Sequence, residues 1–128
     1  MLETITNPKR YTEQELFDKI ATHLLTQNEQ ALSEGDCSYR GAHGLMCAVG
    51  CVIPDEVYDP TMEGTGVSRM LEAFGNKLPE LTPHEDLLSA LQGVHDCYDP
   101  TQWCHRLRDT AVAFGLTMVP APMAVPAP

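Results

Sequence analysis

Apolar residues recur three or four positions apart over residues 12–32, which is the spacing of one face of an α-helix. Thr12 and Glu15 form a capping box at its start, because the side chain of each can bond the backbone N–H of the other. Gly35 and Asp36 follow the end of the pattern. We therefore expect a helix over about 12–32, whose apolar stripe consists of Leu16, Phe17, Ile20, Ala21, Leu24, Leu25, Ala31 and Leu32.

Three more helices are predicted in the second half of the chain. Apolar residues at helical spacing over 67–74 precede Gly75–Asn76, a pair that can adopt the left-handed conformation which ends a helix. Residues 82–85 and 99–102 each place an N-cap residue before proline and a Glu or Gln three positions later, which predicts two further capping boxes. Gly115 is the expected end of the last helix.

Residues 45–53 are apolar throughout, and periodicity cannot separate a buried strand from a buried helix there. No second strong strand signal offers a partner, and a lone strand leaves its backbone groups unsatisfied. We therefore expect a short buried helix near 45–53. The whole pattern predicts an all-α fold: a single compact domain of about five helices over 1–118, followed by an extended Pro-rich tail over 119–128.

The composition fits one folded, cytosolic domain. With 128 residues, of which 43% are hydrophobic, the chain can form a core without metals or disulfides. No apolar run reaches the roughly 18–20 residues that cross a bilayer, and Met1–Tyr11 lacks the apolar stretch of a secretory signal. We expect the five cysteines to be free thiols, because their number is odd and a reducing location is the default.

The charge restricts the class of partner. Eighteen acidic against eight basic residues give a net charge of −10. This argues against direct binding of nucleic acid, since phosphates must be neutralised by Lys and Arg. The charge fits a partner with a basic surface, or it serves solubility alone.

The loop 36–44 holds three candidate binding residues, Tyr39, Arg40 and His43. A guanidinium group offers a planar fork to a carboxylate or phosphate, and a tyrosine ring offers a stacking face. Alternatively, Arg40 is an internal anchor paired with an acidic side chain from residues 55–63, because a buried arginine needs a partner.

Residues 54–64 contain a group of acidic side chains that can bind a hard cation or perform acid–base chemistry. Their spacing is not that of an EF-hand loop, and helix caps in a solvated acidic loop explain them as well. We therefore predict no metal here and keep the group as candidate interaction residues: Asp55, Glu56, Tyr58, Asp59 and Glu63.

His95 and Asp96 form a dipeptide that metal-dependent phosphohydrolases also contain. We favour the simpler interpretation, a histidine near a helix end that bonds a neighbouring carbonyl or carboxylate. The cysteines lack the paired spacing of a zinc site, so small buried thiols are the simpler interpretation. Trp103 is expected in the core. No sequence signature indicates a cofactor or a catalytic nucleophile.

Three segments together resemble a set of small uncharacterised proteins of bacteriophages and prophages. They are Tyr39-Arg40-Gly41 leading into residues 44–50, then residues 91–96 (Leu-Gln-Gly-Val-His-Asp), then Trp103. The resemblance covers about residues 37–115. It implies phage ancestry, a location in the bacterial host cytoplasm and a helical fold, and it assigns no activity to any residue.

These observations lead to three functional hypotheses. In the first, an acidic, non-enzymatic phage-type accessory protein binds and inhibits a host defence protein by covering its basic, nucleic-acid-binding face. In the second, a pocket lined by Tyr39, Arg40, His43 and the acidic residues near 55–63 sequesters a nucleotide-like signal. In the third, the protein is a metal-dependent hydrolase that uses His95 and Asp96.

Overall fold

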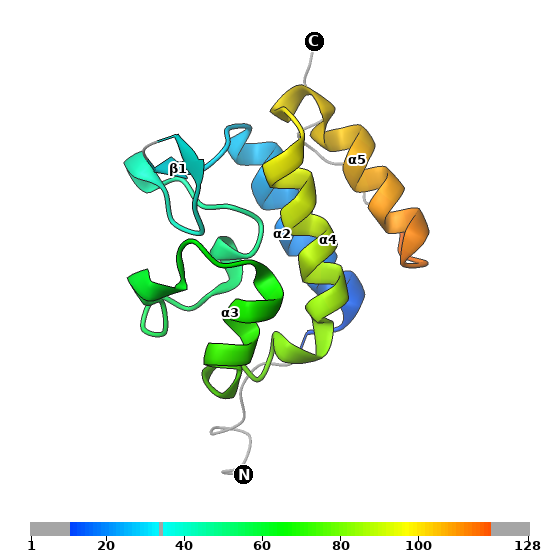
Figure 1. Ribbon diagram of the computed structural model, residues 1–128. Helices are drawn as coiled ribbons and strands as arrows, with labels where there is room; N and C mark the ends of the chain where they lie inside the picture. The colour runs from blue at the N-terminus through cyan, green and yellow to red at the C-terminus, as the bar shows by residue number, and fades with distance from the viewer. Residues whose placement is uncertain (1–10, 34, 119–128) are drawn as a thin grey trace.

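The computed structural model describes residues 11–33 and 35–118, and in this part of the chain it is mostly helical. The expected tail, 119–128, lies outside the described residues. The expectation of an all-α fold with about five helices needs correction, because the described part has four α-helices and a small antiparallel sheet (Figure 1). The elements are α2 (Glu13–Gln27), β1 (Leu32–Ser33), β2 (Asp36–Cys37), α3 (Val67–Phe74), α4 (Glu85–Cys97) and α5 (Pro100–Ala113).

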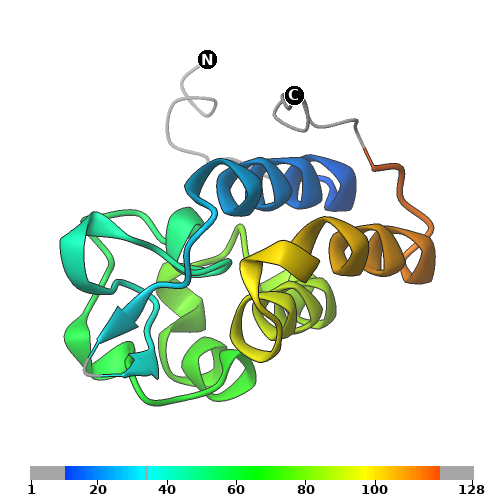
Figure 2. The same ribbon diagram turned by 90° about the horizontal axis from the view of Figure 1, so that it is seen from above.

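Helix α4 is the centre of the helical packing, since it contacts α2, α3 and α5. Helix α2 also contacts α5, so that α2, α4 and α5 form one group, with α3 and the residues between α2 and α3 on one side of it (Figure 2). The core between the helices contains the fully buried Phe17, Leu88, Trp103 and Leu107. The expected burial of Trp103 is confirmed.

The first predicted capping box is confirmed. The Thr12 hydroxyl accepts from the Glu15 N–H at 3.0 Å, and the Thr12 N–H donates to the Glu15 carboxylate at 3.0 Å. The helix ends earlier than expected, at Gln27 rather than at 32. Asn28 adopts the left-handed conformation with φ of 54° and donates its N–H to the Leu24 carbonyl, which ends the helix one turn before the last apolar residues of the stripe.

The other predicted helix ends are partly correct. Asp99 and Gln102 form the capping box of α5, and Gly115 follows that helix with φ of 68°. The box predicted at residues 82–85 is wrong, because residues 82–84 form a 3-10 turn and α4 begins at Glu85 without a side-chain cap. Gly75 is right-handed with φ of −57°, so α3 continues into a 3-10 turn instead of a left-handed stop.

The loop segment, defined as residues 28–66 apart from Glu34, contains the small sheet and three 3-10 turns: Ala42–Gly44, Gly50–Val52 and Pro60–Met62. Its residues 47–50 are buried as expected, but the short helix predicted near 45–53 is wrong, since only one 3-10 turn forms there. The Cys47 N–H donates to the Tyr39 carbonyl at 3.2 Å, and Arg40 forms a β-bridge with Met46. These contacts use backbone groups that a helix would need.

Gly50 explains this backbone path. A Cβ atom at this position would lie 1.9 Å from the Tyr39 carbonyl oxygen, so only glycine allows the two backbone segments to approach this closely. The buried run, residues 45–53, therefore lies between Tyr39 and α2, and its backbone is in close contact with the backbone of Tyr39. No helix of the described residues has the length and apolar character to cross a membrane.

Candidate functional site

Glu63 is the central acceptor of the loop segment. Its carboxylate accepts the backbone N–H groups of Tyr39 at 2.8 Å and Arg40 at 3.0 Å, and the hydroxyl of Tyr58 at 2.6 Å. Burial, and then this bond to Glu63, raise the pKa of Tyr58 to about 12, so the phenol keeps its proton and donates. One side chain from the predicted acidic group thus orders the loop that contains Tyr39.

The Arg40 guanidinium is held by its own chain. Nη1 donates to the Asp55 carboxylate at 3.0 Å and Nη2 donates to the Ile53 carbonyl at 2.6 Å. Nε lies 3.4 Å from the Gly50 carbonyl, and the guanidinium carbon lies 4.8 Å from the centre of the Tyr58 ring. Of the two interpretations left open by the sequence, the structure shows the internal anchor.

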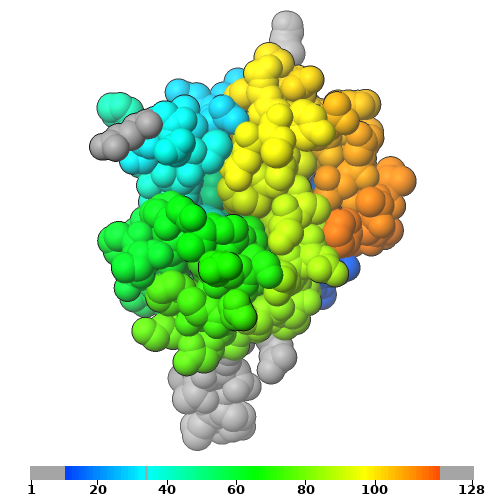
Figure 3. All heavy atoms as spheres, in the orientation of Figure 1, coloured from blue at the N-terminus to red at the C-terminus, as the bar shows by residue number. Residues whose placement is uncertain are grey.

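Tyr39 lines a pocket formed by three segments of the chain. The pocket is lined by residues 37–39, by residues 63–66, and by Gln92 and Asp96 of α4, and its volume is about 220 Å³. We call it the Asp96 pocket. Figure 3 shows the face of the molecule on which the loop segment meets α4. The Tyr39 hydroxyl donates to the Thr65 carbonyl at 2.7 Å, and burial raises its pKa.

His95 precedes Asp96 in α4 and is fully buried, stacked on Trp103 with 5.6 Å between the ring centres. Its Nε2 accepts the Ala31 N–H at 2.9 Å. The proton of the neutral ring is therefore on Nδ1, which donates to the Asp96 carboxylate at 2.7 Å. The prediction that this histidine bonds a neighbouring carboxylate is confirmed.

Cys37 completes the one group in the described residues with three possible metal ligands. One ligand atom each from Cys37, His95 and Asp96 lies within 4.8 Å of the others. However, Nε2 of His95 is occupied by the Ala31 N–H and Nδ1 carries the proton, so neither nitrogen offers a lone pair. Burial, and then the Asp96 charge, raise the pKa of Cys37 to about 11, which disfavours a thiolate ligand or nucleophile. These contacts do not favour a metal centre.

The other predicted site residues do not line this pocket. His43 is exposed in a 3-10 turn with a positive φ of 63°, and Glu56 is exposed on the surface. Asp59 caps the next turn, where hydrogen bonds from the Thr61 N–H and hydroxyl lower the pKa of its carboxyl group. Of the site residues predicted from the sequence, the pocket contains Tyr39, Glu63 and Asp96.

Gln92 is one of the pocket residues that were not predicted from the sequence. Its Oε1 accepts the Val49 N–H at 3.0 Å and its Nε2 donates to Asp96 at 2.9 Å, so it connects the buried run 45–53 to the pocket. The spacing of Gln92 and Asp96, four residues apart on a predicted helix, is a signal that could have found this pair. Cys37 and Ser38 had no such signal.

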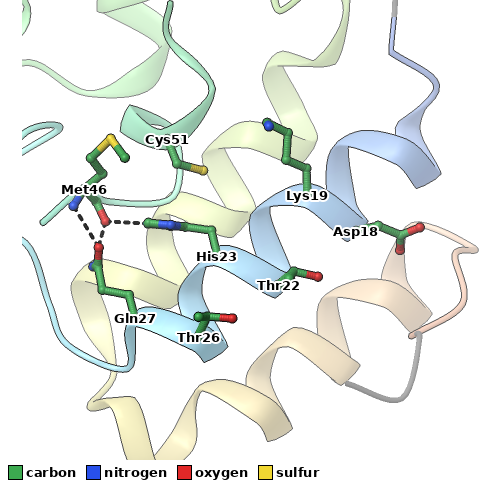
Figure 4. A pocket seen from close by; sticks show the side chains of 8 residues that line it. All are labelled: Asp18, Lys19, Thr22, His23, Thr26, Gln27, Met46 and Cys51. Atoms are coloured by element: carbon green, nitrogen blue, oxygen red, sulfur yellow. Dashed lines mark hydrogen bonds between the residues drawn. The ribbon is translucent and has the colours of Figure 1, made fainter. Parts of the chain in front are cut away.

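A second hollow, of about 710 Å³, runs along α2 (Figure 4). Two α2 side chains that line this hollow form hydrogen bonds with the buried run 45–53. His23 bonds the Met46 carbonyl at 2.8 Å, and Gln27 bonds both the carbonyl and the N–H of Met46. Burial lowers the pKa of His23, so the ring is neutral near pH 7 and donates from Nε2. We attribute a structural role to these contacts.

Charge is divided unevenly between the loop segment and the helices. Arg40 is the only Lys or Arg of the loop segment, and its charge is directed at Asp55 and Ile53. The other five described Lys and Arg residues lie outside it, on α2, on α5 and over 69–77. The loop segment has six described carboxylates: Glu29, Asp36, Asp55, Glu56, Asp59 and Glu63.

Comparison with known proteins gives no relatives. No family model matches the chain, and no curated protein and no solved structure matches it.

Proposed function

We propose that the protein is a non-enzymatic binding protein whose acidic loop segment docks on a basic surface of another protein. The observation that carries this proposal is the six-to-one excess of carboxylates over cations in the loop segment, together with the internal use of Arg40. Complementary charge accelerates association and selects partners of opposite sign. Because of the resemblance to phage proteins, we further propose that the partner is a host defence protein whose nucleic-acid-binding face is covered.

The chemistry of the pocket supports binding over catalysis. Cys37 and Tyr39 both have raised pKa values, so neither is a nucleophile or base near neutral pH. Both ring nitrogens of His95 are engaged in hydrogen bonds inside the protein. The Cys37 thiol and the Tyr39 phenol thus keep their protons, and the two ring nitrogens of His95 are already used in hydrogen bonds.

The pocket is also poorly suited to a nucleotide. It contains the carboxylates of Glu63 and Asp96 and no Lys or Arg among its lining residues, so it repels a phosphate. Its volume of about 220 Å³ is below the roughly 300–1,000 Å³ of typical small-molecule sites.

A capture experiment from bacterial lysate tests the docking proposal. We expect the tagged wild-type protein to retain a host protein at low salt and to release it at high salt, because salt screens surface charges. Neutralising three exposed loop carboxylates should abolish the capture: Asp36→Asn, Asp55→Asn and Glu56→Gln.

A matched control variant neutralises three exposed carboxylates of the helical part: Glu72→Gln, Asp86→Asn and Asp109→Asn. Both variants change the net charge equally, so only the location of the charge differs. The proposal would be overturned if both variants lost the captured protein to the same extent, or if binding of the captured protein did not depend on salt.

A further inference from the structure

We propose that the Asp96 pocket receives one cationic side chain, a guanidinium or ammonium group, from the partner protein. This inference rests on the proposed function and names the part of the partner that enters the pocket. It follows from the balance of donors and acceptors in the pocket, from an unpartnered hydroxyl, and from the size of the cavity.

The hydrogen-bond donors that line the pocket are largely used inside the protein. The Tyr39 hydroxyl donates to the Thr65 carbonyl at 2.7 Å, and the Thr65 hydroxyl donates to the Met62 carbonyl at 2.8 Å. Gln92 donates to Asp96 at 2.9 Å. A ligand that needs donors, such as a phosphate or a carboxylate, would find few of them here.

Acceptor capacity remains on Asp96. Its Oδ1 accepts hydrogen bonds from both His95 and Gln92, and the Cys37 sulfur lies within 4.8 Å of a carboxylate oxygen of Asp96. A carboxylate offers about four acceptor positions, and the Asp96 side chain is 37% exposed. A free acceptor position with a negative charge therefore faces the pocket, and no Lys or Arg lies among the lining residues to neutralise it.

Ser38 supplies an independent observation. Only 8% of its surface is exposed, it lines the pocket, and its hydroxyl has no hydrogen-bond partner among the described residues. Its oxygen can accept a hydrogen bond from a ligand that enters the pocket, which would satisfy it.

The size of the Asp96 pocket favours a single amino-acid side chain over a larger ligand. The volume of about 220 Å³ corresponds to roughly seven water molecules at about 30 Å³ each. Guanidinium and ammonium groups carry only donors, five and three respectively, which matches a pocket whose free capacity lies in acceptors. An arginine or lysine projecting from a basic protein surface fits both the size and the polarity.

NMR titration with small probes tests this assignment. N-acetyl-arginine amide or N-acetyl-lysine amide should shift the backbone amide signals of residues 37–39, 63–66 and 92–96 in the isotope-labelled protein. N-acetyl-citrulline amide, which has the shape of the arginine probe without its charge, should leave them in place. Equal shifts with citrulline, or cation-induced shifts confined to residues 55–59, would overturn the inference.

Two variants with a matched control sharpen the test. Asp96→Asn should weaken binding of the arginine probe about tenfold, because it removes a charge from a hydrogen-bonded pair. Asp86→Asn, the same change on the exposed first turn of α4, should leave binding unchanged. Ser38→Ala, which alters no charge, should weaken binding about two- to threefold. Equal effects of the two Asp→Asn changes, or an unaffected Ser38→Ala protein, would contradict the assignment.

The two proposals can fail separately. The lysate experiment changes Asp36, Asp55 and Glu56, which lie outside the pocket, whereas the test variants of the probe experiment change the pocket residues Asp96 and Ser38. If the probes bind the pocket while the lysate yields no charge-dependent partner, the docking proposal fails. If the partner is captured through the loop carboxylates while the probes leave the pocket signals unchanged, this inference fails.

Discussion

The loop segment and the α-helices are stabilised by different kinds of contact. The helices pack through large apolar side chains such as Phe17, Leu88 and Trp103, all fully buried. In the loop segment, directed hydrogen bonds dominate. The Glu63 carboxylate accepts the backbone N–H groups of Tyr39 and Arg40. The Arg40 guanidinium donates to the Asp55 carboxylate and to the Ile53 carbonyl. Apolar packing depends on buried area and tolerates small shifts, whereas directed polar contacts depend on single atoms. Substitutions in the two regions should therefore change the free energy of unfolding by different amounts.

The largest effect is expected in the helical part. Trp103→Ala removes the largest fully buried side chain, its bond to the Tyr98 carbonyl at 3.0 Å and its stacking on His95. We expect a loss of about 3–5 kcal/mol in the free energy of unfolding, measured by urea denaturation. Val112→Ala, at a position 76% exposed on the same helix, should cost less than about 0.5 kcal/mol. Similar losses at both positions would contradict the packing described for α5.

The next largest effect compares two glycines. Gly50→Ala in the loop segment should cost about 1–3 kcal/mol or more, because its Cβ would meet the Tyr39 carbonyl backbone. Gly93→Ala in α4 should instead stabilise the protein by about 0.5–1 kcal/mol, since nothing lies within 4 Å of the new Cβ and alanine favours helix. The two unfolding midpoints should therefore move in opposite directions. A Gly50→Ala protein as stable as the wild type or more stable would show that the close backbone approach at Gly50 is wrong.

This contrast also explains how much of the structure the sequence could predict. The helices follow from local patterns: the stripe of α2, the boxes at Thr12 and Asp99, and the glycine after α5. The path of residues 45–53 depends on contact between Gly50 and the Tyr39 carbonyl, which no local pattern encodes. The absence of a second strand signal therefore led to a predicted helix where a single 3-10 turn forms.

The candidate site was also only partly predictable from the sequence. Tyr39, Glu63 and Asp96 could be named as chemically capable groups, but sequence could not show that they border one pocket. The pairing of Cys37 with Asp96 brings residues from β2 and α4 together and requires the tertiary fold. Gln92 lies one helical turn before Asp96, and this spacing was the one overlooked local signal.

A smaller effect is expected for the central acceptor of the loop segment. Glu63→Gln should cost about 2 kcal/mol, because an amide oxygen replaces a charged carboxylate that accepts from Tyr39, Arg40 and Tyr58. Glu72→Gln, an exposed control on α3, should change the unfolding free energy by less than about 0.5 kcal/mol. Urea denaturation measures both, and equal stabilities would show that Glu63 does not organise the loop.

The smallest expected effect is a pH dependence at the junction between the loop segment and α2. Burial raises the pKa of Cys51 to about 12 from an ordinary value of 9.0, and the thiol donates to the Ala48 carbonyl. Because the folded pKa is the higher one, the unfolded chain loses this proton first, and the contribution to stability falls as pH rises from 9 towards 12. We expect Cys51 to account for a loss of about 1 kcal/mol in the free energy of unfolding between pH 8 and pH 10.

Cys51→Ser, which keeps a hydrogen-bond donor that does not titrate in this range, should remove this part of the pH dependence in urea unfolding at the two pH values. Cys97→Ser, at an exposed thiol, should leave it in place, and an identical pH slope in wild type and Cys51→Ser would mean that the thiol is not shielded where the loop segment meets α2.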